Sequence, residues 1–172
     1  MSSTWSLPAD IEIPVRHPMA PEPGAQMREH WEKCFGCGSD QPTGLGMTFI
    51  AGEGLTVEAQ FDVAHRYQGG PGVIHGGILS TGFDEAMGTC CMLLANSVVT
   101  AHLEVDYARP IVLGSTLKFS CRIDGAVRRK VYSSAEAYVD GSNAPVATAR
   151  ALFVQIDMDQ HFKDTKQFID HF

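Results

Sequence analysis

Asp84 is the residue whose type and surroundings point most directly to chemistry. It lies in ILSTGFDEAMGTCCMLL, where apolar residues recur at spacings of three and four, as they do on a helix. Fold stability alone would favour Ala or Leu there, because an unpaired carboxylate is costly to remove from water. Two interpretations are open: Asp84 and Glu85 share one polar stripe of the helix, or Asp84 serves acid–base or nucleophilic chemistry.

Two glycines at the start of the same helix favour the chemical interpretation. Gly76 and Gly77 follow His75 and occupy the predicted first turn, where backbone N–H groups lack helical partners and carry the positive end of the helix dipole. Without Cβ atoms, these positions let a ligand oxygen approach the backbone, as an oxyanion hole requires. The sequence thus pairs a site for a polarised carbonyl with the carboxylate of Asp84.

The spacing between these groups predicts more than one subunit. Gly76 and Asp84 are eight residues apart, which corresponds to about 12 Å along a helix axis. One substrate carbonyl therefore cannot contact both groups in a single chain. A second copy running antiparallel would bring its helix start near Asp84, so we expect a homodimer with shared sites.

The elements that must position these residues follow from the hydrophobic periodicity. The segment 76–95 is apolar around most of its circumference, which predicts a long buried helix. Alternation with period two predicts strands near residues 45–49, 55–61, 101–107, 117–123, 131–139 and 147–153. Tight turns between long strands imply antiparallel pairing. A single curved antiparallel sheet wrapped around one buried helix, an α+β fold, satisfies this order.

Less regular segments flank this domain, which we place at residues 27–156. Residues 1–26 contain five prolines, too many for a regular element, and form a lead segment that lies over the domain or is partly mobile. A short helix is predicted at residues 26–33 (QMREHWEK). Residues 157–172 form a polar or weakly amphipathic tail.

Composition limits the partners and the compartment. The chain has 172 residues with 13 Lys and Arg against 20 Asp and Glu, a net charge of −7, which argues against nucleic acid as the main partner. No apolar run reaches the length of a membrane helix, and no signal-peptide pattern opens the chain. Five cysteines, an odd number, do not form a disulfide framework. We expect a soluble, cytoplasmic protein.

No cofactor or metal is expected from the motifs. Neither a Walker nor a Rossmann fingerprint occurs, and no GxSxG elbow is present. Cys34 and Cys37 form a CxxC, but zinc requires four ligands and only His30 is a further candidate nearby. A tight structural turn is the favoured interpretation of this motif.

The order of motifs resembles a known family. HGG with an Asp nine residues after the His is similar to the phenylacetyl-CoA (PaaI-type) thioesterases of the hot-dog superfamily. The segments CFGCGSDQPTGLGMTF and TAHLEVDYARPI match the same group, and the resemblance covers residues 31–156. It implies a hot-dog fold, hydrolysis of an acyl-CoA thioester to a carboxylic acid and CoA, and sites that lie across a homodimer interface.

The resemblance also implies residue roles. Asp84 matches the nucleophile or general base, Gly76 the residue whose N–H polarises the thioester carbonyl, His75 a residue that shapes this loop, and Thr100 a residue that helps to place the attacking water. Several members carry an Asn six residues before the motif His, where this chain has Gly69. Its neighbour Gln68 offers the same donor and acceptor, and both direct attack and water activation are open.

The sequence leaves open how the CoA part of the substrate binds, which acyl group it carries, and whether a related function applies instead. Arg128, Arg129 and Lys130 form a basic hairpin tip, which is either a solvated turn or a docking site for the phosphates of CoA. A non-catalytic acyl-CoA-binding protein and a thioesterase acting on acyl-carrier protein are alternatives. A hydratase is disfavoured because no D-x4-H pair occurs. The acyl group is undetermined, and a dimer or a dimer of dimers would fit.

Overall fold

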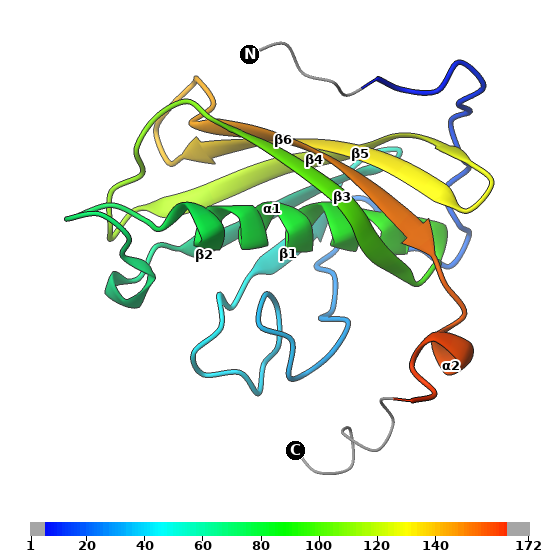
Figure 1. The fold of residues 1–172 in the computed structure, drawn as a ribbon, viewed down its shortest axis with the longest axis horizontal. Coiled ribbons are helices and arrows are strands. Elements are labelled where there is room, and N and C mark those ends of the chain that lie inside the picture. The colour runs from blue at the N-terminus through cyan, green and yellow to red at the C-terminus, as the bar shows by residue number, and fades with distance from the viewer. Residues whose placement is uncertain (1–5, 165–172) are drawn as a thin grey trace.

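A computed structural model of the chain describes residues 6–164 and contains one curved antiparallel sheet and one long helix (Figure 1). The strands are β1 (Thr48–Ala51), β2 (Thr56–Asp62), β3 (Val98–Tyr107), β4 (Thr116–Val127), β5 (Lys130–Val139) and β6 (Ala147–Gln155). The helices are α1 (Gly76–Cys91) and the single-turn α2 (Met158–His161). Strand order across the sheet is β1-β2-β4-β5-β6-β3. The predicted order of two strands, a helix and four strands is confirmed.

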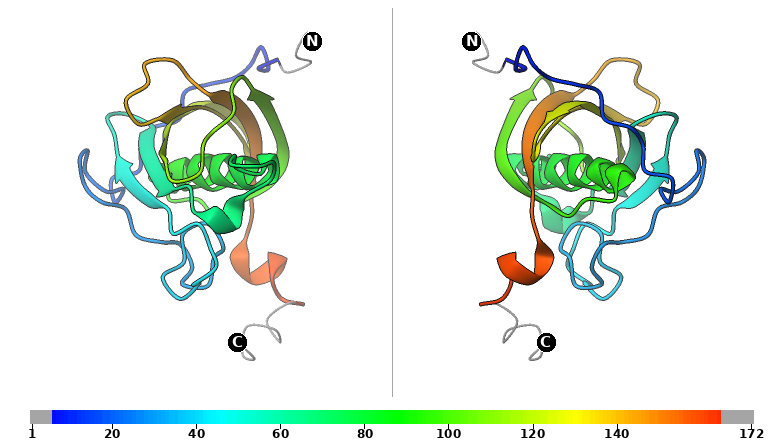
Figure 2. Two further views of the ribbon diagram at one scale, coloured as in Figure 1. Left: turned by 90° about the vertical axis from the view of Figure 1, so that its left-hand side faces the viewer. Right: turned by 90° about the vertical axis from the view of Figure 1, so that its right-hand side faces the viewer.

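Helix α1 lies in the concave face of the sheet, which curls around one side of it (Figure 2). Phe83 and Met87 of α1 are completely buried, and the ring of Phe83 meets that of Phe119 edge-on at 5.1 Å between centroids. A Cβ on Gly82 would lie 2.8 Å from Phe119 Cζ and 3.0 Å from Phe61 Cε1. The close approach of helix and sheet therefore requires glycine at position 82.

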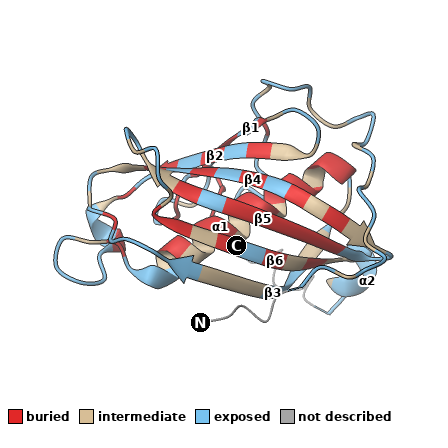
Figure 3. Ribbon diagram, turned by 90° about the horizontal axis from the view of Figure 1, so that it is seen from above, coloured by how far each residue is buried: buried red, intermediate tan, exposed pale blue. Residues whose placement is uncertain are grey.

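Burial alternates along the inner strands, as the period of two predicted (Figure 3). Strand β3 differs, because none of its ten residues is fully buried. It is the last strand on its side of the sheet and, within residues 6–164, pairs only with β6. Leu103 and Val105, which alternation assigned to the core, are only half-buried in this single chain. The outer edge of β3 and the side chains on it thus lack the cover that the other strands have.

The predicted helix at residues 26–33 is wrong. Gln26 instead forms an extended bridge with Ile50, and the N–H of Met27 donates to the carbonyl of Phe49 at 3.0 Å. This backbone pairing with the edge of β1 satisfies the groups that a helix would have paired internally. Turns follow it from residue 32 to residue 37. The tertiary pairing therefore overrides a weak local helix pattern.

Two single-turn 3₁₀ helices lie next to α1 in the chain. His65–Tyr67 form one in the loop between β2 and α1, and Met92–Leu94 extend α1 with the other. Among residues 6–164, no helix has both the length and the apolar character needed to cross a membrane.

The proline-rich lead packs on the sheet over the residues that are described. Glu12 and Ala126 exchange two backbone hydrogen bonds of 3.1 and 2.8 Å. The guanidinium of Arg16 donates to the carbonyls of Gly52 and Gly54 in the β1–β2 turn, at 2.7 and 2.6 Å. Residues 1–5 of the lead and residues 165–172 of the predicted tail lie outside the described part of the chain.

Candidate active site

A pocket runs along the partly exposed side of α1, between the helix, the start of β3 and α2. Its lining includes His30, Asp84, Glu85, Thr100 and Phe153. Asp84 comes from the middle of the helix and Thr100 from β3, the element that returns alongside it. The topology therefore brings together two of the residues that the sequence singled out.

Asp84 and Thr100 are joined directly. The hydroxyl of Thr100 donates to Oδ1 of Asp84 at 2.7 Å. A register shift in the β3–β6 ladder falls immediately after Thr100, and such bulges commonly re-aim a side chain beside a functional site. Asp84 is partly buried and shares the open stripe of α1 with Glu85. Asp84 and Glu85 thus share a polar stripe of the helix, one of the two interpretations open from the sequence, and this stripe forms a wall of the pocket.

At the start of α1, one of the two glycine N–H groups is free in the described chain, and the other is hydrogen-bonded. His75 caps the helix, with its Nδ1 accepting from the N–H of Gly77 at 2.9 Å and its carbonyl accepting from Ile78 and Leu79. Within the described chain, the N–H of Gly76 has no hydrogen-bond partner. Both glycines are exposed. The capacity to polarise a carbonyl therefore rests on Gly76, while Gly77 is held by the histidine.

Tyr107 is a neighbour of Gly76 that sequence reasoning missed. Its hydroxyl donates to the carbonyl of Gly76 at 3.2 Å and lies 2.5 Å from Oγ of Ser80. The alternation of β3 had assigned Tyr107 to an apolar core position, yet its side chain is 53% exposed at the sheet edge. The aromatic ring thus flanks the helix start instead of filling the core.

The loop before the helix leaves no room for the asparagine that the family pattern places at position 69. A Cβ on Gly69 would lie 2.7 Å from the Cα of His75. The neighbouring Gln68 is exposed, and its Oε1 accepts from the N–H of Gly72 at 3.2 Å. Its amide oxygen is therefore used inside the loop, and its amide nitrogen points to no described partner.

The basic tip is the two-residue turn between β4 and β5. Arg128, which has a φ of 53°, and Arg129 form the turn, and Lys130 begins β5. All three are exposed. The next residue, Val131, pairs with Phe153, which pairs with Thr100. Two strand spacings, about 10 Å, therefore separate the base of the tip from the level of Thr100.

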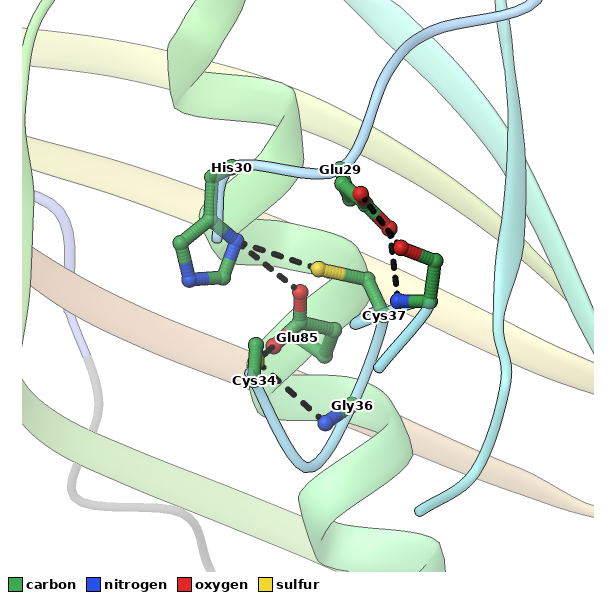
Figure 4. Close-up of polar contacts among 7 residues, drawn as sticks. Glu29, His30, Cys34, Gly36, Cys37 and Glu85 are labelled. Carbon is green, nitrogen blue, oxygen red and sulfur yellow. Dashed lines mark hydrogen bonds and ion pairs between the residues drawn. The ribbon is translucent and has the colours of Figure 1, made fainter. Parts of the chain in front are cut away.

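A second cluster lies one residue further along α1 (Figure 4). His30 Nδ1 lies 3.3 Å from Cys37 Sγ and 3.3 Å from Glu85 Oε1, and Cys34 Sγ lies 3.3 Å from Glu85 Oε2. The four side chains place one donor atom each within 4.8 Å of all the others. Sequence reasoning named His30 and the CxxC but did not find Glu85. The four residue types form a set that can hold a metal ion.

Mutual hydrogen bonding and partial burial perturb the proton affinities of this cluster. The pKa of Cys34 is lowered to about 3, chiefly because Cys37 hydrogen-bonds to its sulfur. The same interaction, together with burial, raises the pKa of Cys37. Hydrogen bonds to Cys34 and then to Glu85 raise the pKa of His30 to about 10. Hydrogen bonding within the cluster therefore shifts the pKa values of its two thiols in opposite directions and raises the pKa of the imidazole.

The part of the chain around Asp84 is similar in sequence to known proteins. The sequence model of the thioesterase superfamily matches residues 71–145, a stretch that contains the helix start, Asp84, Thr100 and the basic tip. Acyl-coenzyme A thioesterase THEM4 from Xenopus laevis is 33% identical over 89 residues, and the protein of the same name from Bos taurus is 30% identical over 93 residues. These alignments cover 52% and 54% of this chain but only 40% and 38% of the relatives.

Several solved structures share the fold at low sequence identity. The thioesterase superfamily protein RHA08564 superposes with a TM-score of 0.67 at 20% identity, covering 72% of this chain and 60% of that one. PaaI of the E. coli phenylacetic acid degradation operon gives 0.61 at 21%, covering 66% and 81%. The smu.793 protein of Streptococcus mutans, solved with acetyl CoA, gives 0.59 at 20%, covering 63% and 86%. At these identities, the comparison shows the hot-dog fold.

The described chain thus carries three chemically distinct features around α1. A carboxylate is held by a hydroxyl in a pocket, a free backbone N–H lies at the helix start, and a cluster of potential metal ligands borders the same pocket. The first two are groups of the kind that can serve as a base or nucleophile and as a polariser of an acyl carbonyl. The third is a set of residue types that can bind a metal ion.

Proposed function

We propose that the chain is an acyl-CoA thioesterase that hydrolyses an acyl-CoA thioester to a free carboxylic acid and CoA. The observation that carries the proposal is the hydrogen bond from Thr100 to Asp84 in the pocket beside α1. The names of the THEM4 relatives, which align over about half of this chain, support the same activity.

The proposed mechanism assigns one task to each group. The N–H of Gly76 donates to the thioester oxygen and stabilises the negative charge that develops on it. Thr100 occupies Oδ1 of Asp84, so Oδ2 takes a proton from the attacking water or attacks the carbonyl carbon itself. With water as the nucleophile, the new C–O bond replaces the C–S bond, the proton held by Asp84 passes to the departing CoA thiolate, and the free acid is released. With direct attack, the C–S bond is replaced by a mixed anhydride on Asp84 and the thiolate takes its proton from water; a further water molecule then hydrolyses the anhydride, which releases the free acid and restores the carboxylate. Both routes use the same carboxylate oxygen.

The catalytic groups belong to two chains in this proposal. Gly76 and Asp84 are separated by eight residues of one helix, about 12 Å, too far for one carbonyl. The outer edge of β3 and the open stripe of α1 offer a surface for a second copy, because unpaired strand edges readily pair with another strand. A homodimer formed along this side brings the Gly76 of one copy to the Asp84 of the other. A dimer of dimers would retain the same composite sites.

The substrate class follows from the surroundings of the pocket. Its apolar lining, including Phe153 and Met92, suits an acyl chain, and the basic tip of Arg128, Arg129 and Lys130 suits the phosphates of CoA. The Streptococcus mutans relative was solved with acetyl CoA, which supports the same ligand class here. The protein requires no resident cofactor in this scheme, because CoA arrives with the substrate.

The decisive experiment is a CoA-release assay on purified protein across aryl, short-chain and long-chain acyl-CoA thioesters. Asp84→Asn should lower kcat by at least about 100-fold with KM little changed, as expected when a catalytic carboxylate is removed. Asp140→Asn is the matched control, because this exposed carboxylate pairs with Lys118 on the surface and should leave the rate unchanged.

Other results would point to the rival functions. Wild-type protein that binds acyl-CoA in calorimetry but releases no CoA would be a non-catalytic acyl-CoA-binding protein. If the enzyme cleaved only thioesters of acyl-carrier protein and not those of CoA, its substrates would be acyl-carrier-protein thioesters. Full activity in Asp84→Asn would remove this carboxylate from the mechanism.

A further inference from the structure

We propose that His30, Cys34, Cys37 and Glu85 bind one Zn²⁺ ion, which fastens the loop of residues 30–37 to helix α1. The proposal does not depend on the thioesterase activity. It rests on the convergence of four metal-binding side chains from two elements that are far apart in the sequence (Figure 4).

The donor set and its dimensions suit zinc. Two cysteine sulfurs, a histidine nitrogen and a carboxylate oxygen are the ligands that Zn²⁺ takes in proteins, with four of them at the corners of a tetrahedron. The ligand atoms around such an ion lie about 3.3–3.8 Å apart. Here, three of the contacts measure 3.3 Å and no two donor atoms lie more than 4.8 Å apart. Small side-chain rotations suffice to close a tetrahedron on a central ion.

One oxygen of Glu85 is left without a hydrogen bond at the centre of this group. Oε1 is completely shielded from solvent and has no hydrogen-bond partner among the described residues. It lies 3.3 Å from Nδ1 of His30, which is an ion-pair distance without hydrogen-bond geometry. The Glu85 side chain as a whole is 12% exposed. A buried carboxylate oxygen in this state is costly, and a cation at the cluster centre would satisfy it.

The loop is shaped closely around these ligands. A Cβ on Gly36 would lie 2.5 Å from the Glu85 carboxylate, and the N–H of Gly36 donates to Cys34 Sγ at 3.3 Å. A Cβ on Gly38 would lie 2.3 Å from the carbonyl of Glu32. The two glycines of CFGCG thus let the chain turn tightly enough to aim both sulfurs at one point. Backbone N–H donation to a metal-bound sulfur is also the outer-shell contact that stabilises a thiolate ligand.

Metal binding accounts for the cluster better than a redox dithiol does. A reactive CxxC usually begins a helix, whereas in the described chain neither cysteine belongs to a helix: Cys34 precedes a turn and Cys37 lies in it. A disulfide would also leave His30 and Glu85 facing each other without a common partner.

The ion would have a structural role beside the proposed catalytic carboxylate. Four protein ligands fill a tetrahedral shell, which leaves no open position for water or substrate. Glu85 directly follows Asp84 in α1, and His30 lines the same pocket. Zinc would therefore fix the helix and one pocket wall relative to each other. Its removal should loosen the pocket and lower thermal stability without removing a reacting group.

The test measures metal in the full chain purified without added chelator. Elemental analysis should give about one zinc per chain, and Co²⁺ replacing it should show thiolate-to-cobalt charge-transfer absorption and tetrahedral visible bands. Glu85→Gln and Cys37→Ser should weaken zinc binding by more than about 100-fold, beyond the loss typical of an outer-shell change. Asp84→Asn, which neutralises the adjacent carboxylate, should keep the metal in full, so that loss of activity and loss of metal are separable.

A second measurement covers the case in which a variant fails to fold. Chelation of wild-type protein should expose two thiols to a thiol reagent while Cys90, Cys91 and Cys121 stay buried, and should lower Tm in a way that added Zn²⁺ reverses. A metal-free protein as purified that takes up zinc no more tightly than Cys37→Ser would overturn the proposal. A Cys34–Cys37 disulfide in the freshly purified protein, shown by mass, would do the same.

Discussion

The Thr100 hydroxyl and the Asp84 carboxylate lie 2.7 Å apart, although one belongs to an edge strand and the other to the central helix. This hydrogen bond fixes the orientation of the carboxylate and leaves its second oxygen open to the pocket. It also ties the start of β3 to the middle of α1, at the point where β3 has a register shift.

Thr100→Val removes the hydroxyl while keeping a β-branched side chain of similar shape. A hydrogen bond to a charged group is worth about 1.5–3 kcal/mol, so kcat should fall by about 10- to 100-fold. KM should change little, because Thr100 is assigned to positioning Asp84 and the water. Thr100→Ser restores the hydroxyl and should recover most of the rate. Equal loss in the Val and Ser variants would show that the strand, rather than the hydrogen bond, matters.

Composite sites predict that two inactive variants complement each other. Gly76→Pro removes the free N–H but suits the first helical position, and His75 before it has the extended ψ of 133° that proline requires. Gly76→Ala keeps the N–H, and its Cβ would meet Tyr107 at 3.5 Å, an ordinary contact. We expect the Pro variant to lose about 100- to 1000-fold in kcat and the Ala variant to stay active.

Co-expression of Gly76→Pro with Asp84→Asn then tests the partnership. Each mixed dimer would contain one site made of the intact Gly76 of one copy and the intact Asp84 of the other. Random pairing of the chains should therefore give about one quarter of wild-type activity from two inactive parents. If co-expression restores no activity while mixed dimers are shown to form, both groups act within one chain.

Charge reversal at the basic tip should weaken binding of acyl-CoA. Replacing Arg128, Arg129 and Lys130 with Glu should raise KM by at least about 10-fold with kcat nearly unchanged, because the phosphates lie away from the thioester. The wild-type KM should also rise with ionic strength, and that dependence should weaken in the variant. Lys118→Glu, near the other end of β4, is the matched reversal. If the tip variant and the wild type had the same KM, the tip would be a solvated turn with no role in binding CoA.

The contact between α1 and the sheet should be intolerant of a single added methyl group. Gly82→Ala places a Cβ 2.8 Å from Phe119, and such overpacking costs about 1–3 kcal/mol. Tm should fall by about 2–4 °C for each kcal/mol lost. Gly88→Ala lies on the same helix with its Cβ 3.6 Å from Phe153, so helix propensity should make it neutral or stabilising. Thermal unfolding of both variants separates packing from propensity.

Local patterns in the sequence were enough to predict most of the fold. The periods of two and of three to four are imposed by strand and helix geometry, so the six strands and α1 could be located from apolar spacing. The same reasoning failed at residues 26–33, where pairing of Gln26 with Ile50 decides the backbone. It also placed Tyr107 in the core, because alternation does not reveal that β3 is an edge strand.

The candidate site also contains features that can be predicted from the sequence and contacts that cannot. The order of residues along one continuous segment is enough to predict a carboxylate after a glycine-rich helix start. The contacts of Thr100 with Asp84 and of Cys34 with Glu85 span 16 and 51 residues of chain and are found only in the folded structure. Such contacts depend on how far the sheet curls around the helix and on where loops return to it. No local periodicity encodes those distances, which are set by packing between elements.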